Sequence, residues 1–337
     1  MKKILVTGGL GFIGSHTVVE LQNKGFNVVI IDDLSNSDIS VLNGITKITG
    51  KKPEFHQIDL KNKDAVQSFF KDQKIDGVIH FAASKAVGES VKQPLKYYEN
   101  NIVTLIYLLQ EMEKNKVNNF IFSSSCTVYG QAEELPITEN APIQPAESPY
   151  GNTKQIGEEI ITDQTKVSNL NAIALRYFNP IGAHPTALIG ELPLGVPQNL
   201  IPFVTQTAAG IRKELTVFGN DYNTHDGTAV RDYIHVVDLA KAHIVAMERL
   251  LFHKNKNNIE FFNIGTGKGS SVLDVIHAFE KANNLKLNYK FDKRRTGDIT
   301  AAYADTTLAN NELNWKSEFT LEDALKDAWK WQQKQTP

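Results

Sequence analysis

The glycine-rich segment TGGLGFIGSH, close to the N-terminus, constrains the fold of this chain more than any other feature of its sequence. Its glycines Gly8, Gly11 and Gly14 lie between an apolar predicted strand, residues 3–8, and a predicted helix at about 12–24. Gly8 permits a tight turn, Gly11 lets the backbone approach a pyrophosphate, and Gly14 permits close packing of the helix. The free amides and partial positive charge at the start of such a helix favour phosphate. The segment therefore predicts a dinucleotide-binding unit.

Asp32 ends the second predicted strand, residues 27–32, where an acid completes this pattern. A carboxylate there accepts hydrogen bonds from the adenosine ribose and repels the 2′-phosphate of NADP, so the predicted cofactor is NAD. The alternative is that Asp32 and Asp33 are ordinary turn residues. The GxxGxxG spacing differs from the GxGxxG pattern of other dehydrogenases and resembles the extended short-chain dehydrogenase/reductase superfamily.

The first half of the chain alternates short apolar runs, rich in β-branched residues, with longer amphipathic stretches. Such alternation is typical of a parallel sheet that is covered on both faces. We therefore predict an α/β protein with a Rossmann-type doubly wound parallel sheet in residues 1–179. Strands are expected at 3–8, 27–32, 54–59, 77–82, 119–124 and 172–178, and helices at about 12–24, 63–73, 94–115 and 149–167.

The second half, residues 180–337, predicts a smaller mixed α/β C-terminal domain. Residues 180–202 contain several prolines and glycines and follow no period, so we expect a long functional loop there. Short strand and helix patterns follow, and the segment at about 230–265 is a candidate to pack back on the first domain.

Composition argues against several classes of function. The 337 residues carry a formal net charge of −2, which gives no support to nucleic-acid or anionic-membrane binding. No apolar run reaches the about 18 residues that a membrane span needs. The single cysteine, Cys126, excludes an internal disulfide and fits a reducing cytoplasm. The chain has nine histidines but neither a cysteine cluster nor an HExxH pattern, so we expect no metal site.

The segment SPYGNTK places Tyr150 and Lys154 one helical turn apart, near a predicted helix start. The spacing alone means little, because Tyr289 and Lys293 repeat it without a serine-rich strand end before them. The first pair follows FSSSCTVYG, which puts Ser125 at the carboxyl end of a predicted strand, the edge where open α/β sheets bind ligands. We therefore interpret Ser125, Tyr150 and Lys154 as catalytic residues.

This trio beside NAD suits the reversible oxidation of a secondary alcohol. A tyrosine acts as a base near pH 7 only if its pKa falls by about three units, which takes about 4 kcal/mol of phenolate stabilisation. We expect the ammonium of Lys154 and an oxidised nicotinamide ring to supply it, while Ser125 relays the proton. Asn100 is expected to buttress this edge of the sheet. Cys126 has no base partner and is interpreted as a buried neutral thiol.

From end to end, the chain resembles the UDP-glucose 4-epimerases (UDP-galactose 4-epimerases). The resemblance rests on TGGLGFIGSH, HFAASKAVGESV, FIFSSSCTVYG, SPYGNTK, RYFNPIGAHP, FGNDYNTHDGTAVRDYIHV and SVLDVIHAF. It implies an isomerase of galactose metabolism that interconverts UDP-glucose and UDP-galactose through a transient 4-keto sugar and tightly bound NAD. It also implies a cytoplasmic homodimer, formed by two helices of each subunit. The helices at 94–115 and 149–167 are candidates, and their apolar residues serve either this interface or sheet packing: Leu105, Leu108, Leu109, Ile156 and Ile160.

The resemblance also implies two sets of binding residues, in addition to the catalytic trio. The NAD site would comprise Gly8, Gly11, Phe12, Ile13, Gly14, Asp32, Asp33, Leu34, Asn36, Ser37, Asp59, Leu60, Phe81, Ala82, Ala83, Lys85, Asn100, Ser125, Tyr150, Lys154 and Phe178. The UDP-sugar site, mainly in the C-terminal domain, would comprise Asn179, Asn199, Leu200, Thr216, Val217, Phe218, Arg231, Arg295, Asp298 and Ala302. The two arginines suit a diphosphate, because a guanidinium offers paired donors.

The residue at Ala302 bears on substrate breadth. Epimerases confined to glucose and galactose often have a bulky aromatic at the position that aligns with Ala302. The small side chain would leave room for an N-acetyl group, which predicts UDP-GlcNAc and UDP-GalNAc as further substrates. If the alignment slips by one residue, Tyr303 occupies this position and the argument fails.

Two other functions remain as alternatives. One is another NAD-dependent nucleotide-sugar enzyme of the extended superfamily, such as a uronate epimerase or decarboxylase. The other is a non-catalytic NAD sensor, which would have no reason to retain the catalytic trio. The related nucleotide-sugar 4,6-dehydratases carry an Asp-Glu pair where this chain has Cys126 and Thr127, which argues against that reaction.

Overall fold

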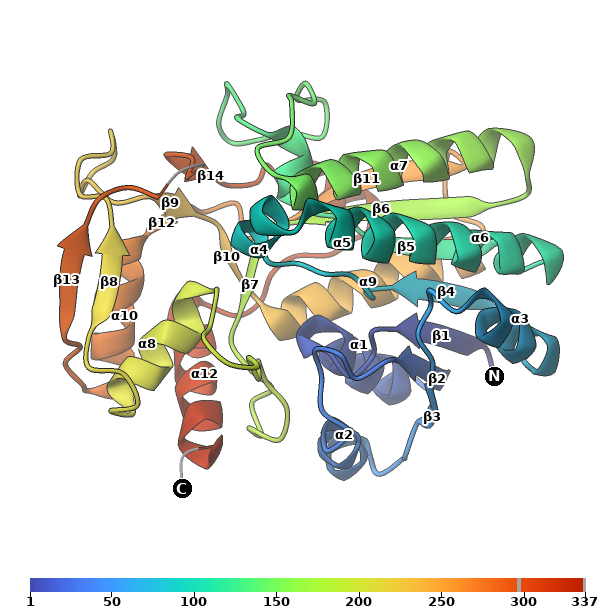
Figure 1. The fold of residues 1–337 in the computed structure, drawn as a ribbon, viewed down its shortest axis with the longest axis horizontal. Coiled ribbons are helices and arrows are strands. Elements are labelled where there is room, and N and C mark those ends of the chain that lie inside the picture. Colours follow the sequence, from blue (N-terminus) through green and yellow to red (C-terminus); the bar gives the residue numbers. More distant parts are fainter. Residues whose placement is uncertain (296–297, 336–337) are drawn as a thin grey trace.

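Seven parallel strands form the central sheet of the protein, in the order β11-β6-β5-β4-β1-β2-β3 (Figure 1). The computed structural model describes residues 1–295 and 298–335. The strands are β1 (Lys3–Thr7), β2 (Asn27–Asp32), β3 (Glu54–Gln57), β4 (Gly77–His80), β5 (Asn119–Ser123), β6 (Asn171–Tyr177) and β11 (Ile259–Ile264). The order of the first six is that of a Rossmann sheet, so the predicted fold class is confirmed.

Two layers of helices cover the sheet because alternate residues of each buried strand point to opposite faces. Ile4 and Val6 of β1 pack in one apolar core and Leu5 packs in the other. The first core lies under α1 (Phe12–Asn23), α2 (Val41–Thr49), α9 (Val236–Leu251) and α11 (Thr307–Glu312). The second lies under α3 (Lys63–Asp72), α6 (Thr104–Lys114) and α7 (Pro149–Val167).

The predicted helix at 94–115 is not one continuous α-helix. It consists of α5 (Pro94–Tyr98), a π-helical turn η1 (Glu99–Val103) and α6. Its residues Leu105, Leu108 and Leu109 are at most 6% exposed and pack on the sheet, so these side chains serve sheet packing rather than a dimer interface. Ile160 packs on the same core, and Ile156 is half-buried. The helices α2 and α4 (Val87–Lys92) were not predicted.

The remaining elements form a smaller unit with its own apolar core, seen at the left of Figure 1. Three small sheets belong to it: β7 (Asn179–Ile181) with β10 (Tyr233–His235), β8 (Leu215–Phe218) with β13 (Tyr289–Asp292), and β9 (Val230–Arg231) with β12 (Ser270–Ser271) and β14 (Ala301–Ala302). Its helices are α8 (Leu200–Ala208), α10 (Val272–Asn283) and α12 (Leu321–Gln335). None of the helices in the described ranges has the length and apolar character to span a membrane.

After β10 the chain returns to the first unit. Helix α9 packs beside α1, and β11 pairs in parallel with β6 as the outermost strand of the large sheet. A buried ion pair joins these two elements: Arg249 Nε donates to Glu260 Oε2 at 2.7 Å, and Nη2 donates to Oε1 at 2.9 Å. Both side chains are at most 8% exposed. The pair therefore fixes α9 relative to β11.

We expect Arg249→Ala to lower the free energy of unfolding by about 3 kcal/mol, because it leaves the buried Glu260 carboxylate without its partner. Urea denaturation measures the change. The exposed pair Lys166–Asp163 provides the control, and Lys166→Ala should change stability little. The double variant Arg249→Met/Glu260→Leu removes both charges and should recover most of the loss. A single variant as stable as the wild type contradicts the prediction.

Candidate active site

The glycine-rich turn joins β1 to α1 in a geometry that only glycine permits. Gly8 has φ +67°, and a Cβ atom there would lie 2.8 Å from the amide nitrogen of Ala82. A Cβ atom on Gly14 would lie 2.2 Å from the carbonyl oxygen of Gly8. Helix α1 therefore begins directly on the turn. Gly11 precedes it without a side-chain cap, which leaves amides of the first turn available to a ligand.

Asp32 connects this turn to the loop that follows β2. Its Oδ2 accepts a hydrogen bond from the amide of Leu10 at 3.0 Å. Its Oδ1 accepts from the amide of Leu34 at 3.0 Å and from the hydroxyl of Ser37 at 2.7 Å. Asp33 instead accepts from Ser35 and shapes the exposed part of the loop. The uncapped turn and the carboxylate beside it fit the pyrophosphate and ribose of a dinucleotide.

Ser125, Tyr150 and Lys154 meet at the carboxyl end of β5. Ser148 caps α7 by accepting a hydrogen bond from the amide of Gly151 at 3.1 Å, which places Tyr150 in the first turn as predicted. Lys154 follows one turn later, and its Nζ donates to the carbonyl oxygen of Ser123 at 2.6 Å. The Ser125 hydroxyl lies near the Tyr150 side chain and accepts a hydrogen bond from the amide of Thr127 at 3.2 Å. All three catalytic candidates are less than 10% exposed.

The pKa of Tyr150 is raised in this structure, whereas a tyrosine that acts as a base near pH 7 needs a lowered pKa. Burial is the main cause of the higher pKa, and Tyr177 and Cys126 raise the pKa further. The nearby Ser125 hydroxyl acts in the opposite direction and lowers it. Burial also lowers the pKa of Lys154 to about 8, although the nearby carboxylate of Glu158 acts in the opposite direction and raises it. The ammonium is directed at the Ser123 carbonyl and lies 5.8 Å from the centroid of the Tyr150 ring. The protein groups alone therefore do not lower the pKa of this tyrosine.

A buried ionic network beneath the trio was not predicted. Glu158, one turn after Lys154, accepts from the Ser124 hydroxyl at 2.6 Å. Arg176 of β6 donates to both Glu158 oxygens, at 3.0 and 2.7 Å, and to the hydroxyl of Tyr129 at 3.1 Å. The available signals were a glutamate four residues after Lys154 and an arginine inside an apolar strand. The network ties α7, β6 and the end of β5 together.

The neighbouring Asn101 takes the buttressing role expected of Asn100. Its Nδ2 donates to the carbonyl oxygen of Ser84 and to the hydroxyl of Thr153, both at 3.0 Å, and its Oδ1 accepts from the amide of Ser84 at 2.8 Å. Asn100 makes a longer contact with the Ser84 hydroxyl, at 3.2 Å. Both lie in the π-helical turn η1, where Asn101 is buried and Asn100 is half-buried. Burial raises the pKa of Cys126 to about 11, as expected of a neutral thiol.

The other residues predicted for NAD come from the carboxyl edge of the same sheet. Phe12 and Ile13 open α1 after β1, and Asn36 lies in the loop after β2. Asp59 and Leu60 follow β3, although Leu60 is buried in the second core. The segment from Phe81 through Ala82 and Ala83 to Lys85 follows β4, and Phe178 follows β6. The fold thus brings these positions to one edge from five different strands.

The residues predicted for the nucleotide sugar lie mainly in the smaller unit. Arg295 pairs with Asp298 at 2.8 Å, and its guanidinium lies 5.1 Å from the centroid of the Phe218 ring. Arg231 on β9 is the register partner of Ala302 on β14. Asn179 begins β7, and Thr216 lies half-buried on β8. Val217, in contrast, is 1% exposed and its side chain faces the core, and Leu200 packs on that core, so at most their backbone groups are available.

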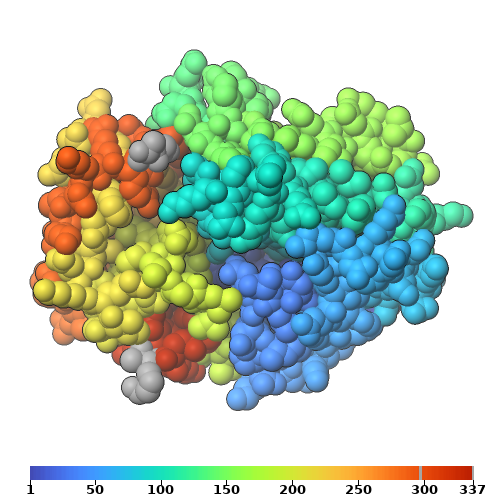
Figure 2. Space-filling model, in the orientation of Figure 1, coloured from blue at the N-terminus to red at the C-terminus, as the bar shows by residue number. Residues whose placement is uncertain are grey.

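Glu191 connects the two predicted binding regions. Its Oε1 accepts from Asn199 Nδ2 at 2.7 Å and from Lys85 Nζ at 3.2 Å. The space-filling view shows a recess where the yellow-green residues near 200 meet the turquoise helices α4 and α5 (Figure 2). Lys85 and Glu191 therefore join the two units across the loop after β7.

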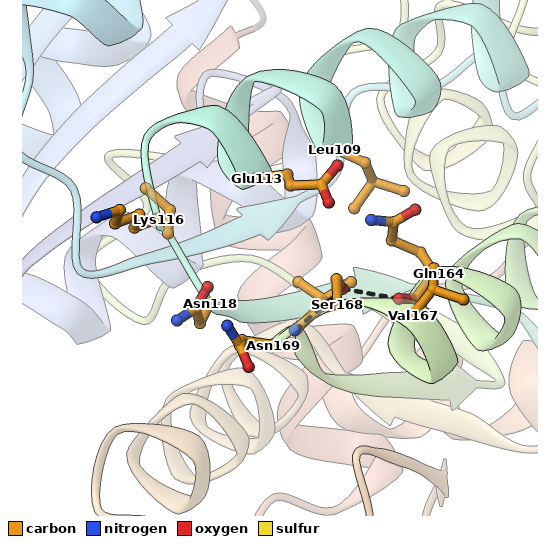
Figure 3. A pocket seen from close by; sticks show the side chains of 10 residues that line it. Leu109, Glu113, Lys116, Asn118, Gln164, Val167, Ser168 and Asn169 are labelled. Atoms are coloured by element: carbon orange, nitrogen blue, oxygen red, sulfur yellow. Dashed lines mark hydrogen bonds between the residues drawn. The ribbon is translucent and has the colours of Figure 1, made fainter.

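Two other features of the structure contain none of the residues predicted for catalysis or for ligand binding. A hollow of about 430 Å³ lies between the ends of α6 and α7, lined by residues such as Glu113, Asn118 and Ser168 (Figure 3). It is at the amino edge of the sheet, opposite the trio. His225, Asp226 and Asp274 form a surface group that could hold a cation, but both carboxylates already accept hydrogen bonds from nearby residues.

The Ser-Tyr-Lys geometry on a seven-stranded Rossmann sheet defines an extended short-chain dehydrogenase/reductase. The family described as GDP-mannose 4,6 dehydratase matches residues 5–328. The UDP-glucose 4-epimerase of Bacillus subtilis is 51% identical over 98% of this chain and 96% of its own, and that of Haemophilus influenzae is 50% identical over 98% and 97%. The chain belongs to the family that this description covers and, within it, to the UDP-glucose 4-epimerases.

Solved structures agree with this assignment. The UDP-glucose 4-epimerase of Stenotrophomonas maltophila, with bound NAD and formylated UDP-arabinopyranose, superposes with a TM-score of 0.95 at 46% identity, over 99% of both chains. The Bifidobacterium longum enzyme, in complex with NAD⁺ and UDP, gives 0.94 at 46% identity, over 99% of this chain and 98% of its own.

We expect the unfolding free energy of the wild type to increase relative to that of Lys154→Met as the pH rises. The folded pKa of Lys154, about 8, lies below its ordinary value of 10.5, so between these values the unfolded state binds more protons. The penalty for burying the ammonium therefore disappears as the pH rises through this window, and the difference in unfolding free energy should grow by about 1–2 kcal/mol from about pH 7.5 to 9.5. Urea denaturation at several pH values measures it. Lys166→Met, at an exposed site, should show no trend, and a flat difference for Lys154→Met contradicts the prediction.

Proposed function

We propose that this protein catalyses the reversible C4 epimerisation of UDP-glucose and UDP-galactose through a 4-keto sugar, with tightly bound NAD. The observation that carries the proposal is the meeting of Ser125, Tyr150 and Lys154 at the carboxyl end of β5, beside the glycine-rich turn. Neither a sensor nor a scaffold needs that trio. The similarity to UDP-glucose 4-epimerases, some of them solved with NAD, supports the same reaction and cofactor.

The side chains divide the chemistry as follows. Tyr150 removes the proton of the C4 hydroxyl, and the nearby Ser125 hydroxyl relays that proton between the substrate oxygen and the phenol. NAD, when bound, would supply the hydride acceptor and, in its oxidised form, a positive charge that favours the phenolate. Lys154 keeps its place through Ser123 and can hold the nicotinamide ribose. Because the cofactor ends each cycle as it began, it is held rather than exchanged.

The smaller unit confines the sugar while it is a reactive ketone. Arg231 and Arg295 bind the diphosphate, and Asn199 at the start of α8 contacts the nucleotide sugar. The loop after β7 closes over the site, held by Glu191 between Asn199 and Lys85. We assign NAD binding to residues 1–179 and UDP-sugar binding to residues 180–337. We also propose a cytoplasmic homodimer through the α5–α6 and α7 helices, where Leu95 is 80% exposed.

Tyr150→Phe tests the proposal most directly. The variant should fold, retain NAD and lose at least about a hundredfold of its epimerase activity, because it has no phenol to exchange a proton. Purified protein is incubated with UDP-galactose, without added NAD, and the sugars are followed by NMR. Tyr289→Phe, which alters the other YxxxK tyrosine, should leave activity unchanged.

Other results would point elsewhere. Wild-type protein that binds NAD but leaves UDP-galactose unchanged supports a sensor. Turnover of UDP-uronates alone supports the related uronate enzymes. Full activity in Tyr150→Phe contradicts the role given to the phenol.

Substrate breadth depends on Ala302, which is 3% exposed and packs in one cluster with Phe178 and Val128. Tyr303 points to the other side of β14, where it approaches Gly269. We propose that the small side chain of Ala302 leaves space beside the sugar. The wild type should therefore turn over UDP-GalNAc as well as UDP-galactose. Ala302→Tyr should lose the first activity and retain the second, and absence of N-acetyl turnover in the wild type contradicts the proposal.

A further inference from the structure

The hydroxyl of Tyr222 is buried without a hydrogen-bond partner among the residues that the structure describes. Tyr222 is 4% exposed and lies in the segment between β8 and β9. Its backbone is well fixed: the amide donates to the carbonyl of Gly227 at 2.9 Å, and the carbonyl accepts from Thr224 at 2.8 Å. A side chain held in this way cannot turn its hydroxyl to water without displacing its neighbours.

The ring of Tyr222 is held from two sides. The guanidinium of Arg294 lies 4.0 Å from the ring centroid and is itself anchored by Asp221, whose Oδ1 accepts from Arg294 Nε at 2.7 Å. On another side the ring packs against Gly219, which has φ +81°. Any side chain at this position would collide with the ring, since a Cβ atom there would lie 2.4 Å from Cε2. These contacts would hold a phenylalanine ring equally well. The packing of the ring therefore gives no reason for a hydroxyl, which destabilises the fold when it is buried without a partner.

The charged groups around the hydroxyl indicate what it is for. Burial raises its pKa, with a contribution from Asp298, while Arg294, Arg231 and Arg295 oppose the change. Three of these four residues are those proposed for the nucleotide sugar: Arg231, Arg295 and Asp298. Contacts of the ring support this position: Gly219 packs against it, and Phe218, the preceding residue, has the Arg295 guanidinium 5.1 Å from its ring centroid. Tyr222 thus lies next to groups that would surround a diphosphate. An O–H donor next to guanidinium groups complements an anion, and a hydrogen bond to a charged partner is stronger than one to a neutral partner.

We propose that Tyr222 is a further substrate-binding residue, whose hydroxyl donates a hydrogen bond to the diphosphate of the nucleotide sugar. The inference rests on the proposed function. It means that the protein carries an unsatisfied donor in its free state, which is satisfied only when the nucleotide binds. Removal of the hydroxyl should therefore affect ligand affinity and stability of the free protein in opposite directions, which a structural hydroxyl would not do.

Tyr222→Phe tests this. Its dissociation constant for UDP, measured by calorimetry, should rise about fivefold or more, while affinity for uridine, which has no phosphate, stays as in the wild type. The Tm of the variant should be equal to or slightly above that of the wild type, because a buried donor without a partner has been removed. KM for UDP-galactose should rise with kcat unchanged, as expected when binding is lost equally in ground and transition states.

Tyr129→Phe is the matched control for stability. The Tyr129 hydroxyl is also buried, but it donates to Asn263 at 2.7 Å and accepts from Arg176, so its removal should lower the Tm. A UDP affinity within twofold of the wild type in Tyr222→Phe overturns the inference. So does a lowered Tm that accompanies weaker binding, or an equal loss of uridine affinity. Wild-type protein that binds no UDP overturns the proposed function together with this contact, whereas normal epimerisation with unchanged UDP affinity in the variant overturns the contact alone.

Discussion

The buried ion pair between Glu158 and Arg176 holds α7, which carries Tyr150 and Lys154, against β6 and the end of β5. Two charges with less than 10% exposure are expensive to bury unless their hydrogen bonds are complete. Here the glutamate accepts hydrogen bonds from two arginine nitrogens and from the Ser124 hydroxyl. The arginine also donates a hydrogen bond to the hydroxyl of Tyr129. The pair sets the rotation of α7 about its axis. Lys154, one turn earlier on the same helix, is thereby directed at the carbonyl of Ser123.

The glycine-rich turn depends on a comparable arrangement at the other side of the site. One carboxylate, Asp32, binds an amide of the turn through one oxygen and the loop after β2 through the other. A ligand on the turn therefore meets a rigid surface, because the amides are already oriented. Pre-orientation of this kind reduces the ordering that binding would otherwise require.

The sequence was sufficient for six of the seven strands of the large sheet and for the helix start at Tyr150, because both depend on local patterns. Strands such as β1 and β5 are continuous apolar runs, and Tyr150 follows a helix cap that can be recognised from Ser148 and Pro149. Features that depend on distant contacts were not accessible. No local pattern reveals that Glu158 pairs with Arg176, or that Asn101 rather than Asn100 makes the buried contacts with Ser84 and Thr153. The raised pKa of Tyr150 likewise results from burial by several segments, and not from its spacing to Lys154.

The position of β11 has a consequence for how the polypeptide can be divided. This strand comes after the elements of the smaller unit, yet it pairs along β6 over six register positions. A fragment that stopped at residue 179 would expose the backbone donors and acceptors of β6 as an open sheet edge, which invites pairing with other chains. It would also lack α9, whose residues contribute to the first core. The two units are thus distinct in architecture but inseparable as folding entities, since the large sheet of the first unit is completed by chain that has already passed through the smaller unit.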